Sequence, residues 1–122
     1  MKRILITDDE FVIAASITNH LEQLGYFVTT VTEGPKINAA VKKDRYDLIL
    51  MNIFLRGGID GIDTMAKIRT FSSIPVIYLT GNTDITTRDR ADKTNPLCFV
   101  GKPFDYEELT EAVEQCLNPS VS

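Results

Sequence analysis

The chain has 122 residues, and 43% of them are apolar, which is enough for one compact domain with a single hydrophobic core. The formal net charge is −4, and the basic residues are dispersed along the chain. Because phosphate binding requires a clustered basic face, these features argue against a nucleic-acid surface or an anionic membrane surface. No apolar stretch approaches the roughly 20 residues of a membrane span, and no signal peptide precedes the first apolar run, so we expect a cytoplasmic protein.

The two cysteines, Cys98 and Cys116, show neither metal-ligand spacing nor the pattern of a disulfide framework. We expect both to be small apolar residues in a reducing compartment. The single histidine, His20, lies beside an apolar helical stripe. We expect it to be a solvated residue, because no second histidine is present to share a metal.

Five short apolar runs predict β-strands, and they lie at residues 2–6, 26–31, 48–51, 76–79 and 97–100. A helical pattern follows each run, with apolar residues at helical spacing within 11–24, 37–41, 62–68, 85–91 and 109–117. In the first helix the predicted buried stripe begins at Phe11 and ends at Leu24. The fourth helix has only Ile85 and Ala91 as apolar anchors, so we expect it to be loosely held. In the fifth, Asp105 is the predicted cap, paired with Glu108 in a capping box.

The alternation of strands and helices with short connections predicts a parallel sheet with right-handed crossovers and helices on both faces. At this chain length we predict the flavodoxin-like fold, a doubly wound α/β domain built from five βα units with strand order 2-1-3-4-5. We assign residues 1–118 to this single domain and residues 119–122 to a frayed C-terminal tail. The strand order places the topological switch point, where such folds carry their sites, between the first and third strands.

Polar side chains stand where the predicted strands end, and the carboxyl ends of parallel strands meet at one edge of the sheet. These side chains are Asp8 and Asp9 after the first strand, Asn52 after the third, Thr80 after the fourth and Lys102 after the fifth. Adjacent carboxylates facing a further oxygen ligand suit a hard cation such as Mg²⁺, although aspartate is also a common helix cap. A lysine near them supplies a counter-charge and a phosphate ligand. A divalent cation, a lysine and a hydroxyl are together the groups that phosphoryl transfer requires.

The order and spacing of five motifs resemble the receiver domain of two-component response regulators over essentially the whole chain. The motifs are Asp8-Asp9, 47–52 (DLILMN), Asp60-Gly61, 74–81 (IPVIYLTG) and 102–104 (KPF). This resemblance implies that the two aspartates hold Mg²⁺ together with the side chain of residue 52 and the backbone carbonyl of Phe54.

The same resemblance assigns roles to three further residues. Thr80 and Lys102 would contact the phosphoryl group, and Phe99 would be the aromatic residue of the conformational switch, with plain core packing as its alternative role. The implied partners are a histidine kinase or phosphotransfer protein. A second receiver or an output partner would bind the face formed by the fourth helix, fifth strand and fifth helix. The domain itself would not be an enzyme.

Asn52 departs from the receiver pattern, because the family has an aspartate there that accepts phosphate from a histidine kinase. A carboxylate oxygen attacks phosphorus to give an acyl phosphate, whereas a neutral amide is a poor nucleophile. The chain as written should therefore not be phosphorylated at this position, and its Mg²⁺ binding should be weakened. The otherwise intact site favours an isolated or engineered substitution of the acceptor over a natural pseudo-receiver that acts as a phosphorylation-independent interaction module.

A small Mg²⁺-dependent phosphohydrolase with an aspartate nucleophile after the first strand is a further hypothesis. Such enzymes have an Asp-x-Asp pattern followed by Thr or Val, whereas this chain has Asp8-Asp9-Glu10-Phe11. The sequence leaves open the cognate kinase, the output, the oligomeric state and whether further domains belong to the protein.

Overall fold

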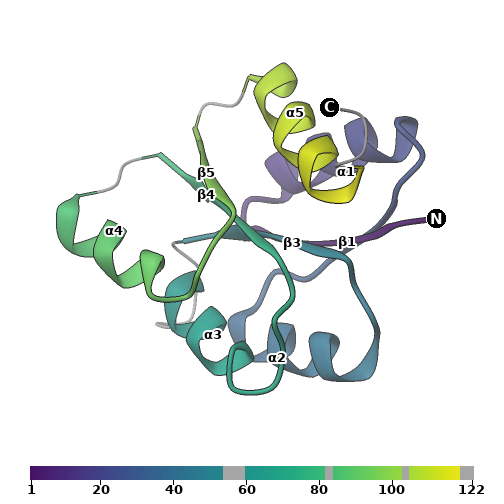
Figure 1. Cartoon of the computed structure of the whole chain (residues 1–122). Helices are drawn as coiled ribbons and strands as arrows, with labels where there is room; N and C mark the ends of the chain where they lie inside the picture. The colour runs from purple at the N-terminus through teal and green to yellow at the C-terminus, as the bar shows by residue number, and fades with distance from the viewer. Residues whose placement is uncertain (54–59, 82–83, 103–104, 119–122) are drawn as a thin grey trace.

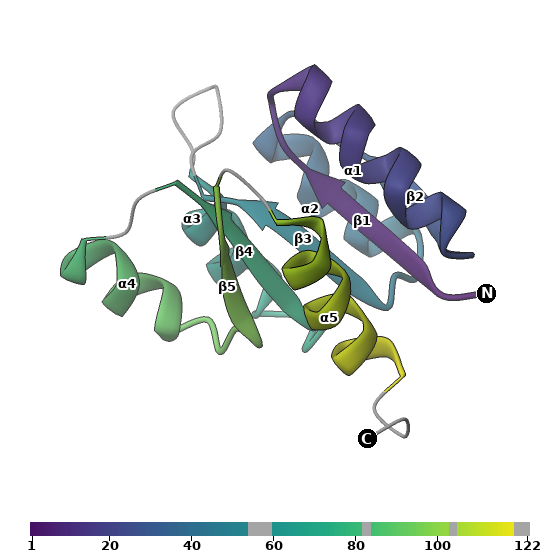
Figure 2. The same ribbon diagram turned by 90° about the horizontal axis from the view of Figure 1, so that it is seen from above.

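The computed structural model of the chain describes residues 1–53, 60–81, 84–102 and 105–118. Five parallel strands form one sheet, namely β1 (Arg3–Thr7), β2 (Phe27–Thr30), β3 (Leu48–Asn52), β4 (Val76–Thr80) and β5 (Cys98–Gly101). Their order is β2-β1-β3-β4-β5, as Figures 1 and 2 show, and the predicted flavodoxin-like order is confirmed. The predicted tail, residues 119–122, lies outside the described residues.

Five helices cover the two faces of this sheet. They are α1 (Phe11–Gln23), α2 (Gly34–Lys43), α3 (Gly61–Ile68), α4 (Ile85–Asp92) and α5 (Tyr106–Leu117). Helices α1 and α5 lie on one face, and α2, α3 and α4 lie on the other (Figure 1). Because successive strand residues point to opposite faces, Ile4 and Ile6 pack under α1 and α5, whereas Leu5 packs with the second cluster.

The burial and the pairing register of the central strands fix the positions of the residues at their ends. Every residue of β3 and β4 is buried, as expected for parallel strands that are covered by helices on both faces. The pairing register aligns the strand ends, because Thr7 is opposite Met51, Asn52 is opposite Leu79, and Thr80 is opposite Gly101. The residues that follow these pairs therefore emerge side by side.

Three predicted contacts at helix termini are wrong. Phe11 and Leu24 do not belong to the buried stripe of α1, which consists of Ala14, Ile17 and Leu21; Phe11 is 79% exposed. Ile85 is 80% exposed and does not anchor α4. Helical spacing gives the direction of a side chain, but it does not tell where the contact between helix and sheet begins and ends.

His20 is half-buried at the flank of α1, where its Nε2 lies 2.7 Å from the Thr110 hydroxyl of α5 and its ring centroid lies 4.9 Å from that of Tyr106. One local prediction needs correction. Asp105 does cap α5, but its carboxylate accepts a hydrogen bond from the backbone N–H of Glu107 at 2.9 Å, one position before the predicted partner. Among the described residues, no helix is long and apolar enough to cross a membrane.

Candidate functional site

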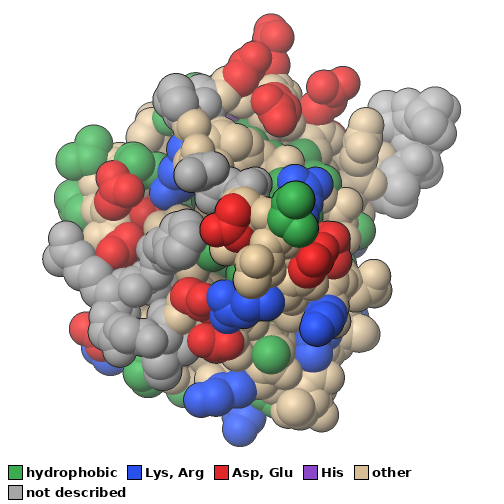
Figure 3. Space-filling view, turned by 90° about the vertical axis from the view of Figure 1, so that its left-hand side faces the viewer, with side chains coloured by type: hydrophobic (Ala, Val, Ile, Leu, Met, Phe, Trp, Pro, Cys, Tyr) green, Lys and Arg blue, Asp and Glu red, His purple; other side chains and the backbone are tan. Residues whose placement is uncertain are grey.

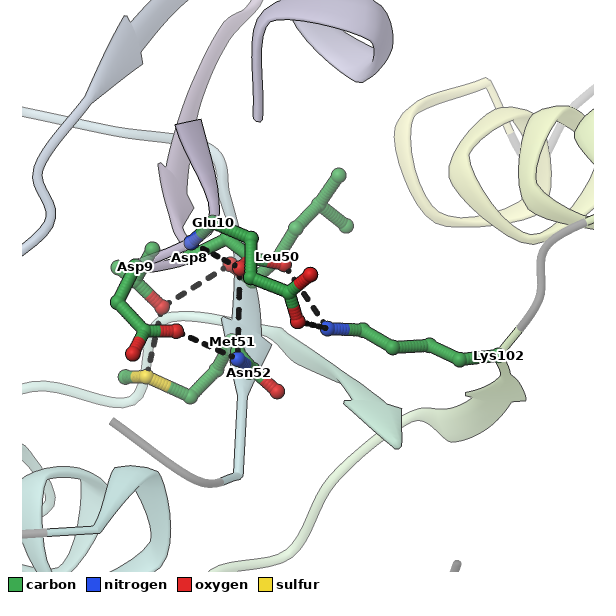
Figure 4. A network of polar contacts seen from close by, with 8 residues as sticks. Asp8, Asp9, Glu10, Leu50, Met51, Asn52 and Lys102 are labelled. Carbon is green, nitrogen blue, oxygen red and sulfur yellow. Dashed lines mark hydrogen bonds and ion pairs between the residues drawn. The ribbon is translucent and has the colours of Figure 1, made fainter. Parts of the chain in front are cut away.

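Four of the predicted site residues meet at the carboxyl edge of the sheet, around the ends of β1 and β3. Figure 4 shows Asp8, Asp9, Asn52 and Lys102 directed toward one another from three strand ends. Figure 3 looks onto this side of the molecule, where acidic and basic side chains lie close together beside residues that are not described. The predicted juxtaposition of these four side chains is thus present in the fold.

Asp8 is the buried centre of the cluster, with no exposed surface. Its Oδ1 accepts a hydrogen bond from the backbone N–H of Glu10 at 2.9 Å, and its Oδ2 forms an ion pair with the Lys102 ammonium at 3.0 Å. A buried carboxylate requires such partners, because removal of a charge from water costs several kcal/mol without them. The turn from β1 into α1 and the end of β5 together supply this compensation.

Asn52 bridges the two aspartates. Its Nδ2 lies 3.4 Å from Asp8 Oδ1 and also 3.4 Å from Asp9 Oδ1, so one amide group donates toward both carboxylates. The side chain ends β3 and is only 5% exposed. A neutral donor between two anions offsets part of their mutual repulsion in the absence of a cation.

Lys102 reaches the cluster from the end of β5. Its backbone N–H donates to the Thr80 carbonyl at 2.8 Å, which extends the pairing of β4 and β5 by one step. Its side chain is 16% exposed, and its ammonium group lies 3.9 Å from Glu10 Oε1 in addition to its closer contact with Asp8. The Thr80 side chain is nearly buried at the neighbouring strand end. The Lys102 ammonium group therefore flanks the carboxylates from the end of β5, and Thr80 ends the neighbouring strand.

Sequence reasoning assigned no role to Gly61, which lies against the backbone of the site. A Cβ atom at this position would lie 2.2 Å from the Asn52 carbonyl oxygen and 2.8 Å from the Met51 side chain. The Gly61 N–H donates to the Ile53 carbonyl at 2.6 Å. The first residue of α3 must therefore lack a side chain for α3 to start so close to the end of β3, and the glycine in Asp60-Gly61 was the available signal.

Thr7 is a second residue that the sequence did not single out. Its hydroxyl donates to the Leu50 carbonyl at 3.2 Å and lies 2.8 Å from the Met51 sulfur, so it fixes the pairing of β1 and β3 one residue before Asp8. A buried threonine in an apolar strand does not differ by composition from an ordinary strand residue.

Phe99 lies away from this cluster, between β4 and α4. Its ring stacks on that of Tyr78 with 5.6 Å between centroids, and the Arg88 guanidinium carbon lies 3.8 Å from the Phe99 ring centroid. The Tyr78 hydroxyl is 2.6 Å from that of Thr94, and burial raises the pKa of Tyr78. Phe99 thus contacts both the sheet and α4. Phe54, the other predicted contributor, lies outside the described residues.

The carboxylates of Asp8 and Asp9 suit a Mg²⁺ ion that is held by few protein ligands. Within the described residues, no three His, Cys, Asp or Glu side chains form a group that could hold a metal ion. Mg²⁺ usually retains several waters and binds through one or two carboxylates, so it does not need such a group. Asp8 Oδ1 and Asp9 Oδ1 both lie 3.4 Å from one atom of Asn52, and the convergence of these two oxygens fits an ion of this kind.

Comparison with known proteins identifies the family of this fold and site. The family model described as the response regulator receiver domain matches residues 4–114. The DNA-binding response regulator MtrA of Mycobacterium tuberculosis is 30% identical over 112 residues, which are 92% of this chain and 49% of that protein. The chain therefore spans about half the length of the curated relatives of this kind.

Solved structures agree with the family match. The signal receiver domain of a modulated diguanylate cyclase from Desulfovibrio desulfuricans has a TM-score of 0.88 and 30% identity, covering 99% of this chain and 97% of that one. A two-component response regulator from Clostridium difficile has a TM-score of 0.91 over the whole of both chains, at 24% identity, which supports the fold alone.

Proposed function

The chain belongs to the response regulator receiver domain family, and on this premise we propose that residue 52 occupies its phosphoacceptor position. One observation carries the proposal: Asn52 ends the central strand with two aspartates on one side and a lysine bound to the same aspartate cluster. An acyl-phosphate site requires this arrangement, because a nucleophilic oxygen, a cation site and a cationic side chain must all reach one phosphoryl group.

We assign the metal site to Asp8 and Asp9, with the residue 52 side chain and the Phe54 carbonyl as further ligands. A bound Mg²⁺ would neutralise charge on the phosphoryl oxygens. Lys102 would bind a phosphoryl oxygen through its ammonium group, and Thr80 would bind another through its hydroxyl. Asp8 keeps Lys102 directed into the site before a phosphoryl group arrives, because their 3.0 Å ion pair is buried on the Asp8 side.

Asn52 blocks the covalent step of this mechanism. In a receiver with aspartate at residue 52, a carboxylate oxygen would attack phosphorus, and the bond from phosphorus to the donor's leaving group would break. The Asn52 amide has no anionic oxygen to form this bond. We therefore infer that the chain with Asn52 remains in the unphosphorylated state, with weakened affinity for Mg²⁺, and that an isolated substitution of the acceptor accounts for it.

The proposal also covers the partners of the domain and its conformational switch. We assign residues 1–118 to a non-enzymatic signalling domain whose partner is a histidine kinase or a phosphotransfer protein. Phe99 would take part in the switch, because it contacts both β4 and α4. The face formed by α4, β5 and α5 would bind a second receiver or an output partner.

The second candidate function is a phosphorylation-independent interaction module, and the absence of a carboxylate at residue 52 is the observation that favours it.

The test is the intact mass of the protein after incubation with acetyl phosphate and Mg²⁺. We expect Asn52→Asp to gain one phosphoryl group and the parent chain to gain none. Asn19→Asp is the matched control, because it makes the same chemical change on the exposed side of α1, far along the chain from residue 52. A parent chain that gains phosphate would contradict the role of residue 52, and failure of Asn52→Asp to gain phosphate would favour the interaction module. Release of phosphate from a generic phosphomonoester would instead indicate a phosphohydrolase.

A further inference from the structure

Helix α4 is attached to the domain with little apolar burial. Of its eight residues, Ala91 alone is buried, and the helix begins at the exposed Ile85. Helix α3, which has the same length, buries five residues, among them Ile62, Met65 and Ile68. The position of α4 therefore depends on its polar contacts far more than the position of α3 does.

Arg90 supplies the ionic part of this attachment. Its guanidinium Nη2 lies 3.0 Å from Asp60 Oδ2 and 3.0 Å from Asp63 Oδ1, so one nitrogen contacts two carboxylates at the start of α3. Asp60 is at the same time the N-cap of α3, because its Oδ1 accepts a hydrogen bond from the Asp63 N–H at 2.8 Å. The two oxygens of Asp60 thus serve different helices.

The start of α3 is also the segment that touches the backbone of the site. Gly61, next to Asp60, lies so close to the Asn52 carbonyl that a Cβ atom would be 2.2 Å from it, and its N–H binds the Ile53 carbonyl. A contiguous path therefore runs from the backbone of residue 52 through Gly61 and Asp60 to Arg90. This path does not include Thr80 or Phe99.

We propose that Arg90 is a positioning residue that clamps α4 to the N-terminus of α3 and transmits displacements of the backbone at residue 52 to α4. The transmission part rests on the proposed function of residue 52, whereas the clamp does not. Exposed ion pairs are weak, but a helix that buries one alanine opens easily, so a weak contact changes its open population measurably.

The other contacts of α4 define where the clamp acts. At the C-terminal end, the Thr94 hydroxyl lies 2.6 Å from that of Tyr78, and the Thr94 carbonyl accepts a hydrogen bond from Arg69 Nε at 2.7 Å. In the middle of α4, Arg88 lies over the Phe99 ring. Arg90 is in the last turn of the helix, between these two sets of contacts. Loss of the Arg90 clamp should therefore loosen α4 around this turn, while the contacts of Arg88 and Thr94 remain.

The clamp is tested by hydrogen exchange of α4 amides in Arg90→Gln. We expect these amides to exchange about five- to tenfold faster than in the parent protein at low salt, and the parent to approach the variant at ~1 M salt, where ion pairs are screened. Lys93→Gln is the matched control, because Lys93 is the C-cap of α4 and the substitution likewise removes one positive charge. Lys93 forms no ion pair within the described part of the chain. Amides of β3 report whether global stability has changed. Equal α4 exchange in Arg90→Gln and Lys93→Gln, with β3 unchanged, overturns the clamp.

Transmission is tested in the Asn52→Asp background with acetyl phosphate and Mg²⁺. We expect a phosphoryl mass gain with and without Arg90→Gln, and a phosphorylation-dependent change in α4 exchange that Arg90→Gln reduces severalfold. A mass gain with an undiminished α4 response in Arg90→Gln overturns transmission. If Asn52→Asp gains no phosphoryl mass, the proposed function is overturned and the transmission with it. The clamp is then still tested by the hydrogen-exchange experiment at low and high salt.

Discussion

The Asn52→Asp substitution should destabilise the metal-free protein, because it replaces a donor by a third carboxylate. Asn52 Nδ2 lies 3.4 Å from one oxygen of Asp8 and one of Asp9. At this separation, each new pair of like charges repels by about 5 kcal/mol at an effective dielectric constant of about 20, before screening and attraction by Lys102. The hydrogen bonds from the amide group are lost in addition.

Protonation limits the size of this effect. The cluster can bind a proton on one carboxyl, which at about pH 7 costs roughly 4 kcal/mol for a group whose unfolded-state pKa is about 3.9. The destabilisation should therefore be about 2–4 kcal/mol, because side-chain relaxation also relieves part of the repulsion. For a domain of this size, the corresponding decrease in Tm is about 10 °C.

The pH dependence has a definite sign. Repulsion raises the folded-state pKa of the new carboxyl group, so the folded variant binds more protons than the unfolded chain above about pH 4. The electrostatic part of the variant's stability deficit should be small at about pH 4 and should grow as the pH rises toward the folded-state pKa. Mg²⁺ should reverse it, because a cation among three carboxylates binds the folded state alone.

Thermal unfolding in chelator and in Mg²⁺ measures these differences. The parent, Asn52→Asp and Asn19→Asp should be compared at about pH 7 and about pH 4. Equal Tm values for the parent and Asn52→Asp in chelator at neutral pH would refute the electrostatic reasoning. An equal gain from Mg²⁺ in both proteins would refute the assignment of residue 52 to the metal site.

Two further predictions concern packing and pH. Gly61→Ala should destabilise the protein by about 2 kcal/mol or more, because its Cβ would overlap the end of β3, whereas Gly101→Ala, with nothing within 4 Å of the new Cβ, should have a much smaller effect in urea unfolding. Burial and, to a lesser extent, the neighbouring Glu114 raise the pKa of Tyr26 to about 12. The unfolded chain then ionises first, so stability should fall as the pH rises from 10 toward 12; Tyr26→Phe should weaken this loss, as followed by alkaline unfolding.

The sequence predicted the sheet order and most of the site because both follow from local patterns. Alternating apolar runs and helices define the parallel sheet, and polar residues at strand ends must meet at one edge of it. For that reason Asp8, Asp9, Asn52 and Lys102 could be grouped before any contact was known.

Features that depend on how two elements approach one another could not be predicted. The role of Gly61 depends on how closely α3 starts to the end of β3, and the role of Arg90 depends on the placement of α4 beside α3. The exposure of Phe11 depends on the point at which α1 meets the sheet. How closely two elements approach, and where they meet, leaves no periodic or compositional pattern in the sequence.

The Asp8–Lys102 ion pair joins residues that are 94 positions apart in the chain. During synthesis, β1 emerges first, whereas Lys102 is added only after β5 has been made. Until then, burial of Asp8 would lack the cation with which it is paired in the folded domain. Nascent chains that end before β5 should therefore keep the end of β1 hydrated, so that complete docking of this strand end is a late event in folding on the ribosome.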